Sequence, residues 1–327
     1  MISVNDIHSK RIAQLLLPFC KSSSHIQNLC RLYCLDVSFI LSVITSRFTF
    51  LHSTALKSMI AYSAAANMNT NKVVLLRHGE SEFNKMNLFC GWHDSPLSEK
   101  GLDYASKIAV AGLRKHKMEF DLIYTSLLTR AHQTIDVIVK DMNYTNLPVR
   151  CHWRLNERHY GNLTGYNKRE MADKFGEEQI QIWRRSYDVL PPKIVPENPF
   201  YSMIRNNPKF KNIPEDIFPD TESLKEVIAR VLPLWECDIM KEVLKGSRVL
   251  VVAHGTVVRA LIKHIDDIGE KEITELNIPN SVPCVFEYDL KTCKRVNKMQ
   301  YLADEEYVKK EQEKVAKIGD YTARKKI

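Results

Sequence analysis

The chain has 327 residues, of which 44% are hydrophobic and 26% charged, as in an ordinary soluble globular protein. This length permits one large domain or two modest ones, with a sizeable hydrophobic core. The formal net charge of +8 favours anionic ligands. The sequence lacks zinc-finger spacing, RNP-type aromatic motifs and basic helices with interleaved aromatic residues, which argues against a nucleic-acid partner.

Cysteine usage indicates a reducing compartment. The eight cysteines are Cys20, Cys30, Cys34, Cys90, Cys151, Cys237, Cys284 and Cys293. The close pair Cys30 and Cys34 lacks the second half of a metal site, so we expect no bound metal. Scattered cysteines in a long chain are typical of reduced thiols, and disulfides are the minority interpretation.

Residues 1–67 differ in composition from the rest, because they are basic, rich in Ser and poor in acidic residues. The apolar stretch at 37–44 is too short to span a bilayer, so we expect no membrane association. Three interpretations stay open: a targeting segment, a disordered extension, or an upstream piece of an over-long gene model that should start at Met68. We predict a separate extension over 1–67 and a folded domain over 68–327.

From residue 72 onward, short apolar strands alternate with amphipathic helices, which predicts an α/β fold with a mainly parallel sheet flanked by helices. We expect strands at 72–76, 122–124 and 248–252, and an edge strand at 285–288. We expect helices after a cap at Ser98, at 127–139, after a capping box of Ser223 and Glu226 with a kink at Pro233, and at 256–265. Residues 186–220 predict an irregular insertion, and the tail from Asp304 is either a helix or mobile.

Two of the predicted strands end in a histidine followed by glycine. VVLL leads into Arg77-His78-Gly79, and VLVVA leads into His254-Gly255. The carboxyl ends of parallel strands form the ligand-binding edge of such sheets, so we expect both histidines there. A histidine can carry a phosphoryl group when cations surround it, and Arg130 follows a third strand. A lone histidine at a strand end is more often a packed or capping side chain, but two with adjacent arginines favour a phosphoryl-transfer site.

Two further polar segments fit this chemistry. WRLNERHYG at 153–161 contains Glu157, a candidate general acid–base, although charge-dense runs are usually surface ion-pair clusters. WRRSY at 183–187 contains Arg184 and Arg185, which suit bidentate binding of phosphate or carboxylate. Taken alone, the paired arginines are more typical of a solvated helix face.

Together these segments resemble one family. RHGESEFN, FCGW, PLSEKG, YTSLLTRA, WRLNERHYG, GEEQIQIWRRSYDVLPP, AHG and VPCVFEYD are similar, in this order from about residue 72 to 305, to the cofactor-dependent phosphoglycerate mutases of the histidine phosphatase superfamily. The resemblance implies a three-layer α/β sandwich. It also implies a glycolytic enzyme of the cytoplasm, a homodimer or homotetramer that interconverts 3- and 2-phosphoglycerate through a phosphohistidine. The cofactor would be 2,3-bisphosphoglycerate as primer, with no metal.

The resemblance also implies a role for each matching residue. His78 would be the phosphorylated nucleophile, Glu157 the proton donor and acceptor, and Arg77, Arg130 and His254 the groups around the transferring phosphoryl group. The rest of the substrate would be bound by Ser81, Asn84, Cys90, Gly91, Arg158, Tyr160, Lys168, Arg184, Arg185, Gly255 and Thr256.

Some positions depart from the family pattern. Thr256 stands where the family has Asn in AHGNS, and Cys90 stands where mutases commonly have Thr. An alternative is therefore a bisphosphoglycerate synthase or phosphatase acting mainly on 2,3-bisphosphoglycerate. A non-catalytic interaction protein on the same fold is a third hypothesis, and the complete set of ionisable groups argues against it.

Overall fold

A computed structural model describes residues 69–317 of the chain. The predictions for residues 1–67, including the domain boundary and the short apolar stretch, lie outside the described residues and stay predictions. Between residues 69 and 317, every helix is too short or too polar to cross a membrane.

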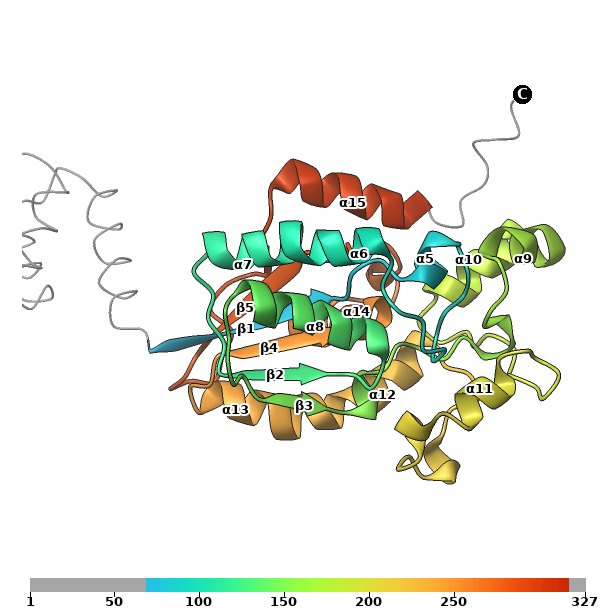
Figure 1. Ribbon diagram of the computed structural model, residues 1–327, viewed down its shortest axis with the longest axis horizontal. Coiled ribbons are helices and arrows are strands. Elements are labelled where there is room, and N and C mark those ends of the chain that lie inside the picture. Colours follow the sequence, from blue (N-terminus) through green and yellow to red (C-terminus); the bar gives the residue numbers. More distant parts are fainter. Residues whose placement is uncertain (1–68, 318–327) are drawn as a thin grey trace, which may run out of the picture. The chain divides into compact units, whose positions relative to one another are not determined.

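A six-stranded mixed sheet lies at the centre of this structure (Figure 1). In spatial order its strands are β3 (Val149–Cys151), β2 (Leu122–Thr125), β4 (Val249–Ala253), β1 (Thr70–Arg77), β5 (Pro283–Asp289) and β6 (Gln300–Tyr301). The first four pair in parallel, whereas β5 is antiparallel to both β1 and β6. The predicted α/β fold with a mainly parallel sheet is confirmed.

Helices cover both faces of the sheet. The α-helices are α5 (Glu82–Lys85), α6 (Glu99–Tyr104), α7 (Ala111–Lys115), α8 (Thr129–Asp141), α9 (Lys168–Phe175), α10 (Glu177–Arg185), α11 (Tyr201–Arg205), α12 (Leu224–Leu234), α13 (Met240–Leu244), α14 (Gly255–Asp266) and α15 (Glu305–Lys317). Short 3₁₀ turns lie at Trp153–Leu155, Gly161–Leu163, Pro208–Phe210, Glu215–Ile217 and Glu272–Thr274. π-helical turns lie at Ala105–Val110, between α6 and α7, and at Trp235–Ile239, directly after α12 and its Pro233.

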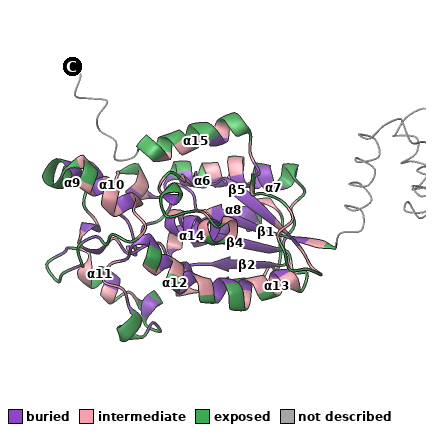
Figure 2. Cartoon of the chain, turned by 180° about the vertical axis from the view of Figure 1, so that it is seen from behind, coloured by how far each residue is buried: buried purple, intermediate pink, exposed green. Residues whose placement is uncertain are grey.

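Strand alternation explains the two cores. Val73 and Leu75 of β1 pack with α12, α13 and α14 in one apolar cluster, whereas Val74 and Leu76 pack with α7 and α8 in another. Successive side chains of a strand point to opposite faces, so an entirely apolar strand is buried on both sides. Figure 2 shows the central strands buried and the outer faces of the helices exposed. Helices α9, α10 and α11 lie beyond the carboxyl ends of the parallel strands (Figure 1).

The predicted helix caps are confirmed, two longer-range predictions are corrected, and a third is decided between its alternatives. The Ser98 cap and the capping box of Ser223 and Glu226 are both present. The strand predicted at 285–288 is present as β5, but its predicted place at the edge was wrong, because β5 lies between β1 and β6 and β6 is the edge strand. The insertion at 186–220 is not wholly irregular, since it contains α11 and two 3₁₀ turns. In the tail from Asp304, Glu305–Lys317 form a helix, α15, and residues 318–327 lie outside the described residues.

Close backbone contact joins α6 to the loop after β1. Ser98 donates from its backbone N–H to the Glu80 carbonyl oxygen at 2.8 Å. A Cβ atom placed on Gly101 would overlap that same oxygen, and a Cβ on Gly79 would lie 2.5 Å from the Gly101 carbonyl oxygen. The loop that carries His78 therefore depends on two glycines packing backbone against backbone.

This contact predicts the sign of one substitution. In a solvated helix, Gly→Ala stabilises a protein by about 0.5–1 kcal/mol. For Gly101→Ala we expect instead a loss of about 1–3 kcal/mol in the free energy of unfolding, because the new methyl group has no space. Urea denaturation measures this value. Gly269→Ala is the control, since its Cβ would meet nothing closer than 3.5 Å and should change stability by less than about 0.5 kcal/mol. A gain in stability for Gly101→Ala would contradict the packing.

Candidate active site

Strand register brings the two histidines together. β1 pairs with β4 so that Arg77 faces Ala253, and the His78 N–H donates to the Ala253 carbonyl oxygen at 3.0 Å. The next residue of each strand is therefore a histidine, and the two rings lie 4.9 Å apart between centroids. The expectation that both histidines share one edge of the sheet is confirmed.

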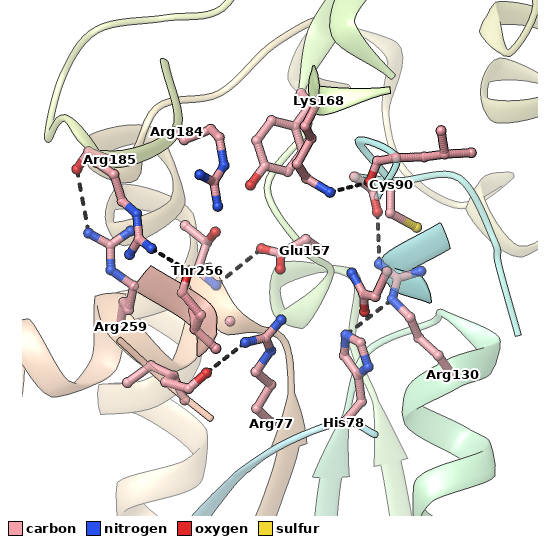
Figure 3. A pocket seen from close by; sticks show the side chains of 17 residues that line it. Arg77, His78, Cys90, Arg130, Glu157, Lys168, Arg184, Arg185, Thr256 and Arg259 are labelled. Carbon is pink, nitrogen blue, oxygen red and sulfur yellow. Dashed lines mark hydrogen bonds between the residues drawn. The ribbon is translucent and has the colours of Figure 1, made fainter. Parts of the chain in front are cut away.

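His78 is a buried, neutral imidazole. Burial lowers its pKa well below the usual value, and the charges of Arg130 and Arg77 lower it further. Its Nδ1 lies 2.5 Å from the Gly79 carbonyl oxygen, which can only accept a hydrogen bond, so Nδ1 carries the proton. The lone pair of Nε2 is then available, and the Nε–H of Arg130 points at it from 3.3 Å (Figure 3). A neutral ring with an accessible Nε2 is the form that can attack phosphorus.

His254 lies beside His78 but not among the residues that line the pocket. Its Nε2 is 2.8 Å from the Ser126 hydroxyl oxygen. Burial, Arg130 and His78 together lower its pKa well below the usual value, so this ring is neutral too. It is the N-cap residue of α14, although its side chain makes no capping hydrogen bond.

The pocket in front of His78 is open and strongly cationic, with about 750 Å³ of empty space including its mouth. Its charged lining residues are Arg77, Arg130, Glu157, Lys168, Arg184, Arg185 and Arg259. Glu157 is the one carboxylate among the described residues that line it, and Figure 3 shows it between Arg77 and the group of Arg184, Arg185 and Arg259. This excess of positive charge suits a ligand with several negative charges.

Three of the pocket arginines donate hydrogen bonds to backbone carbonyl groups. Arg77 donates to Ile278 O at 2.6 Å, Arg130 to Gly91 O at 2.8 Å and Arg259 to Ile273 O at 2.7 Å. Within residues 69–317, the buried Nε atoms of Arg77 and Arg259 have no hydrogen-bond partner. Carbonyl oxygens orient a guanidinium without cancelling its charge, so these side chains retain capacity for an anion.

Burial perturbs two of the cations strongly. It lowers the pKa of Lys168 to about 7, with Arg184 adding to the effect. It lowers the pKa of Arg259 to about 9, with Arg185 and Arg158 contributing. Both shifts reflect positive charges held close together in a poorly solvated place, and a bound anion would relieve them.

Glu157 is held by two backbone N–H groups. Its Oε1 accepts from Arg158 N at 2.8 Å and from Thr256 N at 3.2 Å. Thr256 is the second residue of α14, so the carboxylate sits at the positive end of that helix. The family pattern has Asn where this chain has Thr256. This difference does not affect the contact with Glu157, because the backbone N–H of residue 256 makes it.

Of the other predicted site residues, some line the pocket and two do not. Asn84, Cys90, Gly91, Tyr160 and Gly255 line the pocket. Ser81 and Arg158 do not. Ser81 is the buried N-cap of α5, bound to the backbone of Asn84, while Arg158 stacks on the Tyr160 ring at 4.5 Å and donates to Arg184 O at 3.0 Å.

Sequence reasoning missed four lining residues: Leu88, Arg259, Ile278 and Val315. One of them could have been found, because Arg259 lies four residues after Gly255 on the same helix, and positions i and i+4 share a face. Ile278 and Val315 come from a loop and from α15, and no local pattern connects them to the strand ends.

Comparison with known proteins identifies the class. The model of the histidine phosphatase superfamily (branch 1) matches residues 73–299. The chain belongs to this superfamily. Proteins from Borreliella burgdorferi (strain ZS7) and Borreliella afzelii (strain PKo), both called 2,3-bisphosphoglycerate-dependent phosphoglycerate mutase, are 46% and 47% identical to it over 250 residues, or 76% of this chain and 98% of each relative.

A solved structure supports the fold. The phosphoglycerate mutase from Bacillus anthracis str. Sterne superposes with a TM-score of 0.53 at 22% identity, covering 76% of this chain and 99% of that one. At this identity the likeness concerns the fold alone. It agrees with the sheet and helix layers described above.

The shifted pKa of Lys168 makes a testable prediction. In an unfolded chain the pKa of lysine is about 10.4. Between pH 7 and 10 the unfolded chain therefore binds more protons than the folded one. The wild type consequently gains stability as pH rises. Burying the charged form of Lys168 costs stability, and this cost is fully present below pH 7. The substitution Lys168→Met removes it. Without ligand at pH 7, the variant should be more stable than the wild type by on the order of 1 kcal/mol, and the difference should shrink towards pH 10.

Urea denaturation at pH 7, 8 and 9 tests this prediction. A difference that does not change with pH would show that the pKa of Lys168 is not lowered in the folded protein. The same variant should bind phosphoglycerate more weakly, since it loses one of the pocket charges.

Proposed function

We propose that this protein is a 2,3-bisphosphoglycerate-dependent phosphoglycerate mutase that interconverts 3- and 2-phosphoglycerate. The observation that carries the proposal is the neutral His78, whose Nε2 opens onto a pocket lined by cations and a single carboxylate. The two Borreliella relatives, which the chain matches over nearly their full length, support the same activity.

The chemistry follows from this chain's own residues. Nε2 of His78 attacks phosphorus, a nitrogen–phosphorus bond forms, and the bond from phosphorus to the glycerate oxygen breaks. Arg77 and Arg130 stand where the equatorial oxygens gather negative charge. Glu157 gives a proton to the departing oxygen and, in the reverse transfer to the other hydroxyl group, takes one back.

The negative charges of the cofactor and of the substrate match the positive charges of the pocket. A bisphosphorylated glycerate carries two phosphates and a carboxylate, which the cations near His78 and the group around Arg184, Arg185 and Lys168 can bind at opposite ends. The unpartnered Nε atoms of Arg77 and Arg259 fit an anionic ligand of this kind. We infer that 2,3-bisphosphoglycerate primes the enzyme by phosphorylating His78.

The remaining inferences come from the family resemblance. They are a homodimer or homotetramer in the cytoplasm, small phosphoglycerates as ligands, and no requirement for metal, nucleic acid or membrane. Among the described residues, no group of His, Cys, Asp and Glu side chains is arranged to hold a metal ion.

Two residues favour a second candidate, a bisphosphoglycerate synthase or phosphatase. Cys90 lines the pocket, and its thiol is directed to the His93 carbonyl oxygen at 3.4 Å. Burial raises the pKa of this thiol, so it offers the ligand no negative charge. Thr256 also replaces the amide side chain of the family pattern by a hydroxyl and a methyl group, so the amide is not available to the ligand.

A coupled assay of 3-phosphoglycerate conversion, with and without catalytic 2,3-bisphosphoglycerate, distinguishes these functions. We expect turnover that depends on the bisphosphate. Negligible turnover, with bisphosphate hydrolysed or accumulated instead, would favour the second candidate.

His78→Ala should abolish both turnover and acid-labile labelling of the protein by 2,3-bisphosphoglycerate, because the nucleophile is gone. We expect a loss on the order of 10⁴-fold or more. The matched control is His116→Ala, which removes an exposed imidazole and should leave both rates unchanged. Retained labelling in His78→Ala would rule out this residue as the phosphorylated group.

A further inference from the structure

A buried ion pair lies directly behind the segment that carries Glu157. Glu222, just before α12, and Arg230, on α12, are 3% and 9% exposed. The Arg230 Nε lies 2.6 Å from Oε1 of Glu222, and its Nη2 lies 3.1 Å from Oε2. Taking two charges out of water is costly, and a buried pair is often no more stabilising than apolar side chains of similar size. Its presence here therefore calls for a role beyond stability.

The remaining donors of Arg230 show what this role is. Nη1 donates to the Arg154 carbonyl oxygen, and Nη2 donates to Asn156 O at 2.8 Å and Glu157 O at 3.1 Å. A guanidinium is planar and presents five N–H groups in a fixed arrangement, so one side chain can hold three carbonyl groups at once.

Glu222 holds the same segment on the other side of Glu157. Its Oε2 accepts from His159 N at 2.9 Å, and its own N–H donates to His159 O at 2.9 Å. Burial lowers the pKa of His159 to about 3, so this ring stays neutral and does not compete for the carboxylate of Glu222.

The segment 154–159 is thus held at main-chain atoms both before and after Glu157. The carboxylate of Glu157 is held separately, by the N–H groups of Arg158 and Thr256. Nothing in this arrangement places Glu222 or Arg230 in the pocket lining, so neither contacts the ligand directly.

We propose that Glu222 and Arg230 are positioning residues that fix the backbone under Glu157, and so aim its carboxylate at the oxygen that leaves or attacks. This inference rests on the proposed role of Glu157 as general acid–base. A misplacement of about 1 Å at a reacting group can cost about 100-fold in rate. Loss of the pair should therefore impair proton transfer specifically, and leave the nucleophile and the phosphate-binding arginines in place.

The leaving group separates positioning from general damage. When a glycerate oxygen leaves phosphorus it becomes an alkoxide and needs the proton of Glu157. When acetyl phosphate reacts, the bond between Nε2 of His78 and phosphorus forms, the bond from phosphorus to the acetate oxygen breaks, and acetate leaves with the electron pair. Acetate is a weak base and leaves without a proton, so this transfer does not depend on Glu157.

The experiment compares Glu222→Gln and Arg230→Lys with the wild type and with Glu157→Gln, all as full-length chains. Each is measured for mutase turnover and for acid-labile labelling of His78 by acetyl phosphate. We expect the two positioning variants to lose about 30- to 100-fold in mutase kcat, with labelling within about three-fold of the wild type. Glu157→Gln should show the same selectivity, with a larger loss of turnover.

The control removes a second carboxylate–guanidinium pair, which is exposed and lies at the amino ends of β2 and β4, away from the pocket. Asp121 precedes β2 and binds the guanidinium of Arg248, which precedes β4. Asp121→Asn should leave both rates unchanged. Because an uncompensated buried charge can prevent folding, the double variant Glu222→Leu with Arg230→Met removes both charges together and should show the same selective loss.

The outcomes are distinct. An equal loss of turnover and of labelling in the positioning variants would overturn the proposal, since it would mean general disruption of the pocket. Full turnover in the double variant would overturn it as well. Failure of the proposed function itself would be seen separately, as a wild type that does not interconvert the phosphoglycerates.

Discussion

Parallel pairing between β1 and β4 is the constraint on which the site depends. The register that places Arg77 opposite Ala253 makes the residues after each strand emerge side by side. β4 and residues 73–76 of β1 are apolar and buried on both faces, so a one-residue slip would expose a hydrophobic side chain or bury a polar one. The position of His78 next to His254 is thus set by the hydrophobic core and not by contacts within the site.

Positive charge is the second organising feature. The pocket collects arginines and a lysine around His78, and burial makes this accumulation costly, as the lowered pKa values of Lys168 and Arg259 indicate. The fold tolerates it because backbone carbonyl groups orient the guanidinium groups. An anionic substrate then supplies the missing negative charge, so binding energy is available from relief of a strain already present in the folded protein.

The same charges explain why His78 is a nucleophile and not a cation. Arg77 and Arg130 disfavour a protonated ring, and Gly79 keeps the remaining proton on Nδ1. Glu157 is the one acidic group among the described residues that line the pocket. Backbone N–H groups hold its carboxylate, and the buried pair of Glu222 and Arg230 holds the main chain on either side of it. The nucleophile and the proton donor therefore come from separate segments of the chain, and each has its own supporting contacts.

Much of this was determined by the sequence alone. Strand ends, helix caps and the motifs around His78, Glu157 and His254 depend on neighbours within a few residues, so local patterns predicted them, and the family resemblance supplied the proposed chemistry. The tertiary structure decided what depends on distant contacts. It moved β5 inside the sheet, brought Arg259, Ile278 and Val315 to the pocket, and set Arg158 and His254 behind its wall. It also paired Glu222 with Arg230 beneath Glu157, because side chains from segments far apart in sequence meet only when the sheet and its helices pack.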